Sequence, residues 1–122
     1  PQMPRTKHAV ATRKRKRRLR KSAEGYVGGR RKLHRTMKET VRRSGAYAYR
    51  DRRNKKRDFR RLWITRLSAA LTEHELNYSR FIHGLKLAEY PVNRKALSEL
   101  AIHDPEAFGE VVELAKNAQE SE

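Results

Sequence analysis

The sequence predicts an all-α protein in which a long, basic N-terminal helical extension precedes a small C-terminal helical domain. Three observations favour this fold class. No proline occurs between Arg30 and Thr72, and only Gly45 interrupts that stretch. Apolar residues after position 58 recur at helical spacing, and no alternating pattern indicates a strand. Charge divides sharply, because residues 1–66 hold 26 Lys+Arg and 4 Asp+Glu, whereas residues 67–122 hold 5 and 10.

The charge balance predicts a polyanionic partner. A net charge of +17 and a pI near 10.9 favour binding to nucleic acid or to an anionic membrane surface. With 36% hydrophobic and 37% charged residues, the whole chain cannot pack around one ordinary core. No apolar run approaches the roughly 18 residues of a membrane span, and no signal-peptide stretch follows the basic N-terminus. The lack of cysteine fits a reducing compartment, so we expect a cytoplasmic protein without a membrane partner.

We expect residues 1–58 to form the extension and residues 59–122 to form the domain. The densest basic run of the first 24 residues is "RKRKRRLRK", and we expect it to become helical once its charges are neutralised. The next segment, "EGYVGGRR", places three glycines around Tyr26. It predicts a bend where the backbone adopts positive φ or lies close to a partner.

From Arg30 to about Thr72 the pattern predicts one helix, bent or weakened near "RSGAY". Eight of the twelve positions from Arg50 to Arg61 are lysine or arginine. On a helical wheel they cover most of the circumference, and the remaining sector holds Asp51, Asn54 and Asp58. Each of the two aspartates can pair with a lysine or arginine three or four positions away.

A helix that is basic on nearly all sides is unsuited to a protein core or a membrane surface, since both require an apolar face. It suits phosphates that approach from several sides, where counterion release drives binding and arginine adds bidentate hydrogen bonds. Three tyrosines lie among the basic residues, Tyr26, Tyr47 and Tyr49. Each could stack on an unpaired base or pack against neighbouring turns, and the sequence leaves both open.

Four helical segments are expected in the domain, gathered around Trp63, Phe81 and Phe108. The end of the long helix presents one apolar face made of Phe59, Trp63, Leu67, Ala70 and Leu71. The second segment begins after an N-cap at Asn77 or Ser79, ends between Gly84 and Tyr90, and directs inward Tyr78, Phe81, Ile82 and Leu85.

The third segment is capped by Asn93 and directs inward Ala96, Leu97, Leu100 and Ala101. The fourth has Asp104 as its N-cap and Pro105 at its first helical position. Its buried face comprises Phe108, Val111, Val112 and Ala115. We expect the final "NAQESE" to fray.

The sequence predicts no enzyme, no catalytic residue, no metal site, no cofactor and no small-molecule substrate. The histidines His8, His34, His74, His83 and His103 are scattered without the i, i+4 spacing of a helical zinc site. No nucleophile elbow is present, and the three glycines do not form GxGxxG.

Five stretches occur in the order and spacing of one family: "GYVGGRRK", "YAYRDRRNKKRDFRRLWITRLSAA", "NYSRFIHGLKLA", "NRKALSELA" and "DPEAF". Over residues 5–116 the chain resembles the bacterial large-subunit ribosomal protein number twenty family. The resemblance implies a structural ribosomal protein that binds large-subunit ribosomal RNA directly, supports early subunit assembly and contacts neighbouring large-subunit proteins. The chain departs from the usual pattern in its "PQMP" start and in the more charged "LHRTMKETVRRSG".

Residues carried over as RNA contacts are the basic runs and the glycine turn. They are Arg13, Lys14, Arg15, Lys16, Arg17, Arg18, Arg20, Lys21, Gly25, Tyr26, Gly28, Arg30, Arg31, Arg50, Arg52, Arg53, Lys55, Lys56, Arg57, Arg60 and Arg61. The composition alone does not separate RNA from DNA, so a DNA-compacting protein is the alternative, and repression of its own messenger RNA is a further role to consider. An organellar ribosome is an alternative location to a cytoplasmic one.

Overall fold

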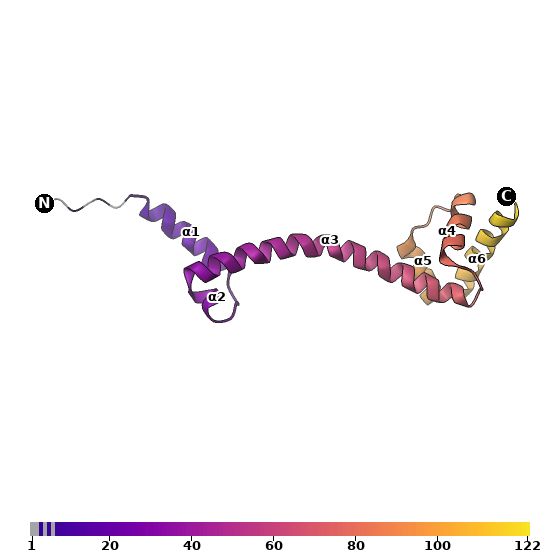
Figure 1. Ribbon diagram of the computed structural model, residues 1–122, viewed down its shortest axis with the longest axis horizontal. Helices are drawn as coiled ribbons and strands as arrows, with labels where there is room; N and C mark the ends of the chain where they lie inside the picture. Colours follow the sequence, from indigo (N-terminus) through magenta and orange to yellow (C-terminus); the bar gives the residue numbers. More distant parts are fainter. Residues whose placement is uncertain (1–2, 4, 6) are drawn as a thin grey trace. The chain divides into compact units, whose positions relative to one another are not determined.

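All regular structure in the described residues is helical. The computed structural model describes Met3, Arg5 and residues 7–122, so most of the "PQMP" start lies outside the described residues. The helices are α1 (Ala9–Ser22), α2 (Gly29–Lys32), α3 (His34–Thr72), α4 (Tyr78–Leu87), α5 (Arg94–His103) and α6 (Pro105–Glu120) (Figure 1). The predicted all-α class is confirmed. The chain separates into two compact units, Pro1–Arg53 and Asn54–Glu122.

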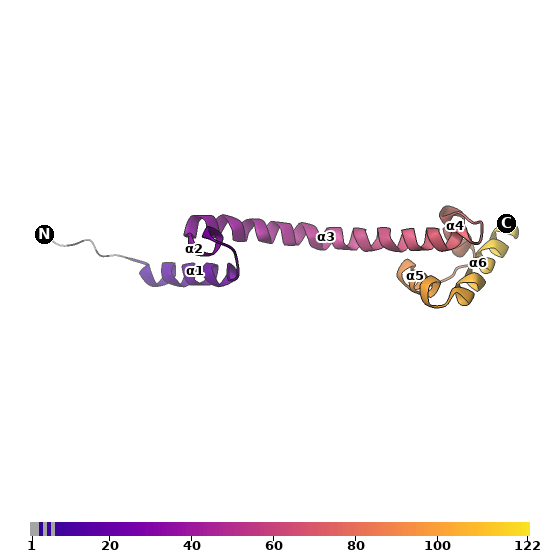
Figure 2. The same ribbon diagram turned by 90° about the horizontal axis from the view of Figure 1, so that it is seen from below.

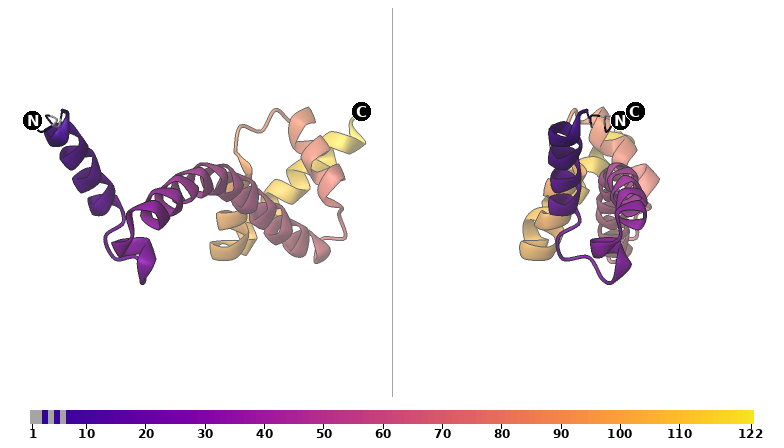
Figure 3. Two further views of the ribbon diagram at one scale, coloured as in Figure 1. Left: turned by 60° about the vertical axis from the view of Figure 1, so that its left-hand side comes forward. Right: turned by 90° about the vertical axis from the view of Figure 1, so that its left-hand side faces the viewer.

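In the first unit, α1 and the start of α3 are joined by a glycine turn and the short α2, which lies where the two helices converge (Figures 2 and 3). The long helix does not begin at Arg30 as predicted. Leu33 is extended, with φ −92° and ψ 121°, and separates α2 from α3. Its carbonyl accepts the first backbone bond of α3, from Met37 at 2.8 Å. Position 33 is neither proline nor glycine, so the sequence gives no local signal for this break.

The glycine at position 45 does not interrupt α3, so the weakening predicted there is not found; the bend predicted as its alternative stays a prediction. One glycine in a helix interior costs only about 1 kcal/mol relative to alanine. Its neighbours form a continuous backbone ladder, so the helix continues through the segment. A sharp kink also requires a proline, a bulge or an inserted group, and the sequence has no proline here.

The second unit is built around one apolar core. Its buried side chains come from the end of α3 and from the last three helices: Leu67, Leu71, Phe81, Leu85, Leu97, Phe108, Val111, Val112 and Ala115. The rings of Phe81 and Phe108 meet at its centre, with centroids 5.8 Å apart. The buried face predicted for α6 is confirmed in full.

Two parts of the predicted core are wrong. Phe59 is 44% exposed and Trp63 is only partly buried, and the two rings stack on each other, with centroids 6.2 Å apart. The stripe that they continue enters the core only at Leu67, so the core does not form around Trp63. In α5 the inward position expected for Ala96 is exposed, and Ser98 is buried instead. The Ser98 hydroxyl donates to the carbonyl of Lys95 at 3.0 Å, which satisfies it without an external partner.

The predicted caps of α5 and α6 are confirmed. The Asn93 carboxamide oxygen accepts from the Ala96 amide at 3.0 Å, and the Asp104 carboxylate accepts from the Ala107 amide at 3.1 Å. Asn77 occupies the N-cap position of α4 but makes no side-chain capping bond. The bonds from Asn93 and Asp104 satisfy amides that have no partner within the first helical turn.

The helices α4 and α6 pack against each other, and their backbones come into close contact at Gly84. A Cβ placed on this residue would lie 2.4 Å from the Ala115 carbonyl oxygen, so only hydrogen fits between the two backbones. The C-terminal segment also contacts α4, because the Gln119 side chain donates to the carbonyl of Arg80. Helix α6 continues to Glu120, so only Ser121 and Glu122 of the segment predicted to fray lie beyond its end.

The ends of α3 and α4 close in the same way. After each helix a glutamate adopts a left-handed backbone, Glu75 with φ 55° and Glu89 with φ 54°. The following amides bond back across the turn, from Leu76 to the carbonyl of Leu71 and from Tyr90 to the carbonyl of Leu85. Such closures usually place glycine at the left-handed position.

Candidate nucleic-acid interface

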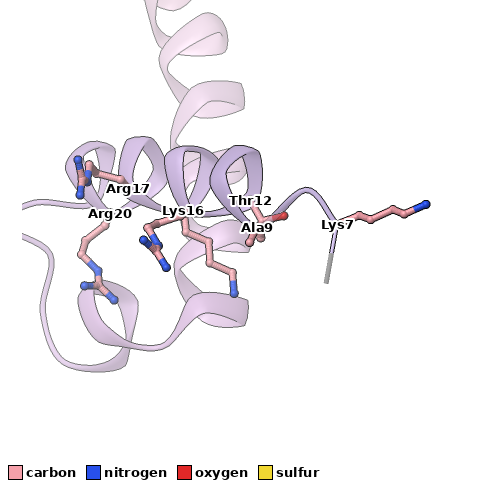
Figure 4. A pocket seen from close by; sticks show the side chains of 7 residues that line it. Lys7, Ala9, Thr12, Lys16, Arg17 and Arg20 are labelled. Carbon is pink, nitrogen blue, oxygen red and sulfur yellow. The ribbon is translucent and has the colours of Figure 1, made fainter. Parts of the chain in front are cut away.

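The basic residues of α1 are exposed on all sides of the helix. Every lysine and arginine from Arg13 to Lys21 is exposed, and the helix has no buried residue. A groove runs along one side of α1 and is drawn in Figure 4, where Lys16, Arg17 and Arg20 project from the same helix. It is lined by Lys7, Ala9, Thr12, Arg13, Lys16, Arg17 and Arg20. With five of seven lining residues cationic, the groove is a site of positive potential.

The glycine turn owes its sequence to backbone conformation. Gly25 and Gly28 have φ of 88° and 62°, which confirms the predicted positive φ, and nothing lies within 4 Å of a Cβ built on either residue. Glycine is therefore favoured at these two positions by the positive φ, and not by a lack of room for a side chain. Tyr26 lies between them and donates its hydroxyl to the Ser44 hydroxyl at 3.1 Å, which ties the turn to α3.

The turn brings together cations that are far apart in the sequence. A second groove is lined by Arg17, Arg20, Lys21, Glu24, Arg31 and Lys32. The α1 residues that line it thus share one concave surface with residues of α2. Arg17, Arg20, Lys21 and Arg31 were predicted from the sequence as separate RNA contacts. Lys32 was not predicted, although it lies in the same "GRRK" run.

The basic segment of α3 keeps its charges in solvent. All eight lysines and arginines from Arg50 to Arg61 are exposed. Asp58 pairs with Arg61 at 3.6 Å, in the predicted i, i+3 relation. Asp51 pairs with the adjacent Arg50 at 3.0 Å, where a partner three or four positions away was predicted. Exposed pairs of this kind contribute at most about 1 kcal/mol, so they leave the segment free to bind anions.

Tyr47 and Tyr49 carry arginines on their rings. The Arg50 guanidinium carbon lies 4.7 Å from the Tyr47 ring centroid, and that of Arg53 lies 4.5 Å from the Tyr49 centroid. Arg53 also donates to the Tyr49 hydroxyl at 2.6 Å. The sequence left open whether these tyrosines stack on bases or pack on neighbouring turns. Each ring lies against an arginine of the next turn, and stacking on a base stays a prediction.

The histidines of the second unit make isolated contacts. His83 lies 3.3 Å from a Glu122 carboxylate oxygen, and His103 lies 3.1 Å from a Glu99 carboxylate oxygen one turn earlier. Within residues 7–122, together with Met3 and Arg5, no three His, Cys, Asp or Glu side chains gather in a metal-binding arrangement. Across the same described residues, no helix has both the length and the apolar character needed to cross a bilayer.

The all-α fold, the exposed arginine-rich helices and the small separate core are typical of basic helical nucleic-acid-binding proteins. The model of the family "Ribosomal protein L20" matches residues 5–111, and the chain belongs to this family. It is 55% identical over 116 residues to the large ribosomal subunit protein bL20 of Oceanobacillus iheyensis. It is 53% identical to the proteins of that name from Staphylococcus saprophyticus and Staphylococcus carnosus. Each comparison covers 95% of this chain and 98% of the relative.

Proposed function

We propose that this chain is a structural constituent of the large ribosomal subunit that binds large-subunit ribosomal RNA directly and supports early subunit assembly. The observation that carries the proposal is the solvent-exposed basic surface of α1, of the α1–α2 groove and of α3 from Arg50 to Arg61. Membership of a ribosomal protein family supports the choice of ribosomal RNA among polyanions. The expected role is architectural, without chemistry of its own.

Counterion release supplies the driving force for this binding. Each phosphate that a lysine or arginine neutralises frees condensed cations, and affinity then falls with rising salt by a slope of roughly 0.7–0.9 per phosphate. The exposed guanidinium groups also match phosphate oxygens bidentately. Only two ion pairs, Arg50 with Asp51 and Arg61 with Asp58, compete with phosphate along the segment.

The part of the second unit that follows the basic segment of α3 is suited to a different kind of contact. Residues 67–122 carry twice as many acids as bases, a net charge of −5, and enclose the apolar core. We assign the RNA contacts to the basic residues of α1, of the α1–α2 groove and of α3 up to Arg61, and the contacts with neighbouring large-subunit proteins to residues 67–122. The chain then resides wherever its ribosomes are, in the cytoplasm of a bacterium or in an organelle.

Charge reversal tests the assignment. In the full chain, Arg52→Glu, Arg53→Glu and Arg57→Glu together remove three cations from α3. The matched control reverses Arg80, Lys86 and Lys95, three exposed bases of the second unit, and changes the net charge by the same amount. We measure affinity for large-subunit ribosomal RNA against salt, with duplex DNA as a competitor.

We expect the α3 triple variant to lower the salt slope by about 2–3, while the control triple lowers it much less. Equal effects of both triples would mean that net charge alone matters and would overturn the assignment. Preference for duplex DNA would favour a DNA-compacting protein instead. In extracts treated with DNase, the chain is expected to sediment with large subunits.

A further inference from the structure

Two exposed tyrosines lie inside the arginine-rich part of the first unit. Tyr47 is 49% exposed and Tyr49 is 57% exposed, on a stretch of α3 where residues 42–53 are all exposed. Neither ring contributes to a core. Tyr26 differs from them, because its hydroxyl is bonded to Ser44 and it is half-buried. Packing within this unit therefore does not explain why aromatic residues occupy positions 47 and 49.

Each ring is held by an arginine of the following turn. Arg50 covers Tyr47 at 4.7 Å and Arg53 covers Tyr49 at 4.5 Å, measured from guanidinium carbon to ring centroid. The hydrogen bond from Arg53 to the Tyr49 hydroxyl, 2.6 Å long, adds a second restraint. A restrained ring loses less rotamer freedom when a flat ligand stacks on it. A guanidinium plane over a ring also offers a second stacking surface of its own.

We propose that the Tyr47–Arg50 pair and the Tyr49–Arg53 pair are two stacking sites for unpaired bases of RNA. The proposal rests on the RNA-binding function above and adds to it a preference for unpaired nucleotides. Phosphate contacts carry no such preference, because every RNA strand has phosphates. A π face accepts any base but reaches it only where the base is not already stacked within a helix.

The balance of interactions favours the stacking of a base on each ring. A base stacked on an aromatic side chain raises affinity by about 5- to 150-fold, as judged from alanine substitutions. A cation over an exposed ring is worth only about 2- to 5-fold in the same terms. A base that stacks on the open face of either ring gains this affinity and leaves the arginine contact in place. At Tyr49, displacement of Arg53 would also break its hydrogen bond to the tyrosine hydroxyl, so stacking on the open face is favoured there.

The two sites face different sides of the helix. Residues two positions apart in an α-helix are separated by about 200° around its axis. One base on Tyr47 and another on Tyr49 must therefore approach from nearly opposite directions. This agrees with a helix whose cations also surround it, and it predicts that the two sites act independently.

The test uses the full chain and two RNA probes of equal length. The first is a single-stranded oligonucleotide that contains 2-aminopurine, whose fluorescence falls when it stacks, and the second is a blunt RNA duplex. The variants are Tyr47→Leu, Tyr49→Leu and both together, with Tyr47→Phe and Tyr49→Phe as conservative partners. The matched control is Leu62→Ala, which removes a 39% exposed apolar side chain from the same helix without removing a ring.

We expect each Tyr→Leu change to weaken single-strand binding by about 5- to 20-fold and to reduce quenching, with an unchanged salt slope. The Phe variants should retain most of both signals, and duplex binding should hardly change. The stacking sites would be overturned if the Leu variants quenched 2-aminopurine fluorescence as strongly as the wild type does. They would also be overturned if these variants lost as much affinity for the duplex as for the single strand. If the wild-type chain showed no salt-dependent RNA binding at all, the proposed function would fail first, which keeps the two failures distinct.

Discussion

Alanine in place of Gly84 is expected to destabilise the second unit by forcing α4 and α6 apart. The added Cβ would lie 2.4 Å from the Ala115 carbonyl oxygen and 2.9 Å from its carbonyl carbon. These atoms belong to the backbone of α6, so no side-chain rotation relieves the overlap. Restoring ordinary van der Waals contact requires the helices to separate by about 1 Å.

The size of the effect follows from what that separation disturbs. Phe81, Leu85 and Val112 are buried between these helices and their neighbours, and a gap of about 0.5–1 Å forfeits roughly a quarter to a half of a contact's attraction. Overpacking in a close-packed core typically costs about 1–3 kcal/mol. Because the overlapping atoms belong to the backbone, we expect the overlap in Gly84→Ala to lower the free energy of unfolding by about 3 kcal/mol. The higher helix propensity of alanine offsets about 1 kcal/mol of this loss. The net loss is about 2 kcal/mol of the free energy of unfolding.

Urea unfolding of the full chain, followed by circular dichroism, measures this loss. The matched control is Gly109→Ala in α6, where an added Cβ meets only a His74 side-chain atom at an ordinary 3.6 Å. This control gains helix propensity without overlap, so its stability should rise by up to about 1 kcal/mol. A Gly84→Ala protein that unfolds at or above the wild-type urea midpoint would refute the reasoning.

Two further predictions concern the core and the extension. Phe81→Ala should lower the free energy of unfolding by about 3–5 kcal/mol because the ring is fully buried, whereas Phe59→Ala, at 44% exposure, should cost less than about 1 kcal/mol. Similar losses in urea titrations would contradict the described core. Residues 1–58 alone should show little helicity in low salt and more with RNA, since Ala23 and Met37 are the only buried hydrophobic residues described there. The fragment Phe59–Lys116 should fold alone, and a stable far-ultraviolet helix spectrum for residues 1–58 in salt-free buffer would contradict this division.

Features encoded by neighbouring residues could be predicted from the sequence. The caps at Asn93 and Asp104 depend on a side chain and an amide three positions later, and both bonds form. The buried face of α6 follows from helical spacing in the same way. The limits of the core could not be predicted, since spacing shows that Phe59 and Trp63 continue a stripe but not where α4 and α6 stop covering it.

The candidate interface divides along the same line. Exposure of the basic residues follows from their number, because no core could neutralise them. The meeting of Arg17 and Arg20 with Arg31 in one groove depends on how the glycine turn directs the chain, which composition does not encode. The break at Leu33 likewise lacks a local signal. Assignment of individual RNA contacts stays a prediction.

The left-handed glutamates after α3 and α4 have a consequence for the order of folding. The left-handed backbone conformation costs a residue with a side chain roughly 1 kcal/mol, whereas it costs glycine almost nothing. Local preference therefore does not favour the turns at Glu75 and Glu89 in the unfolded chain. Leu76 and Tyr90 follow these glutamates and pack against the core, and this packing must hold both turns in place. We expect both turns to close only after the helices have begun to dock, so they belong to the late, downhill side of the folding barrier.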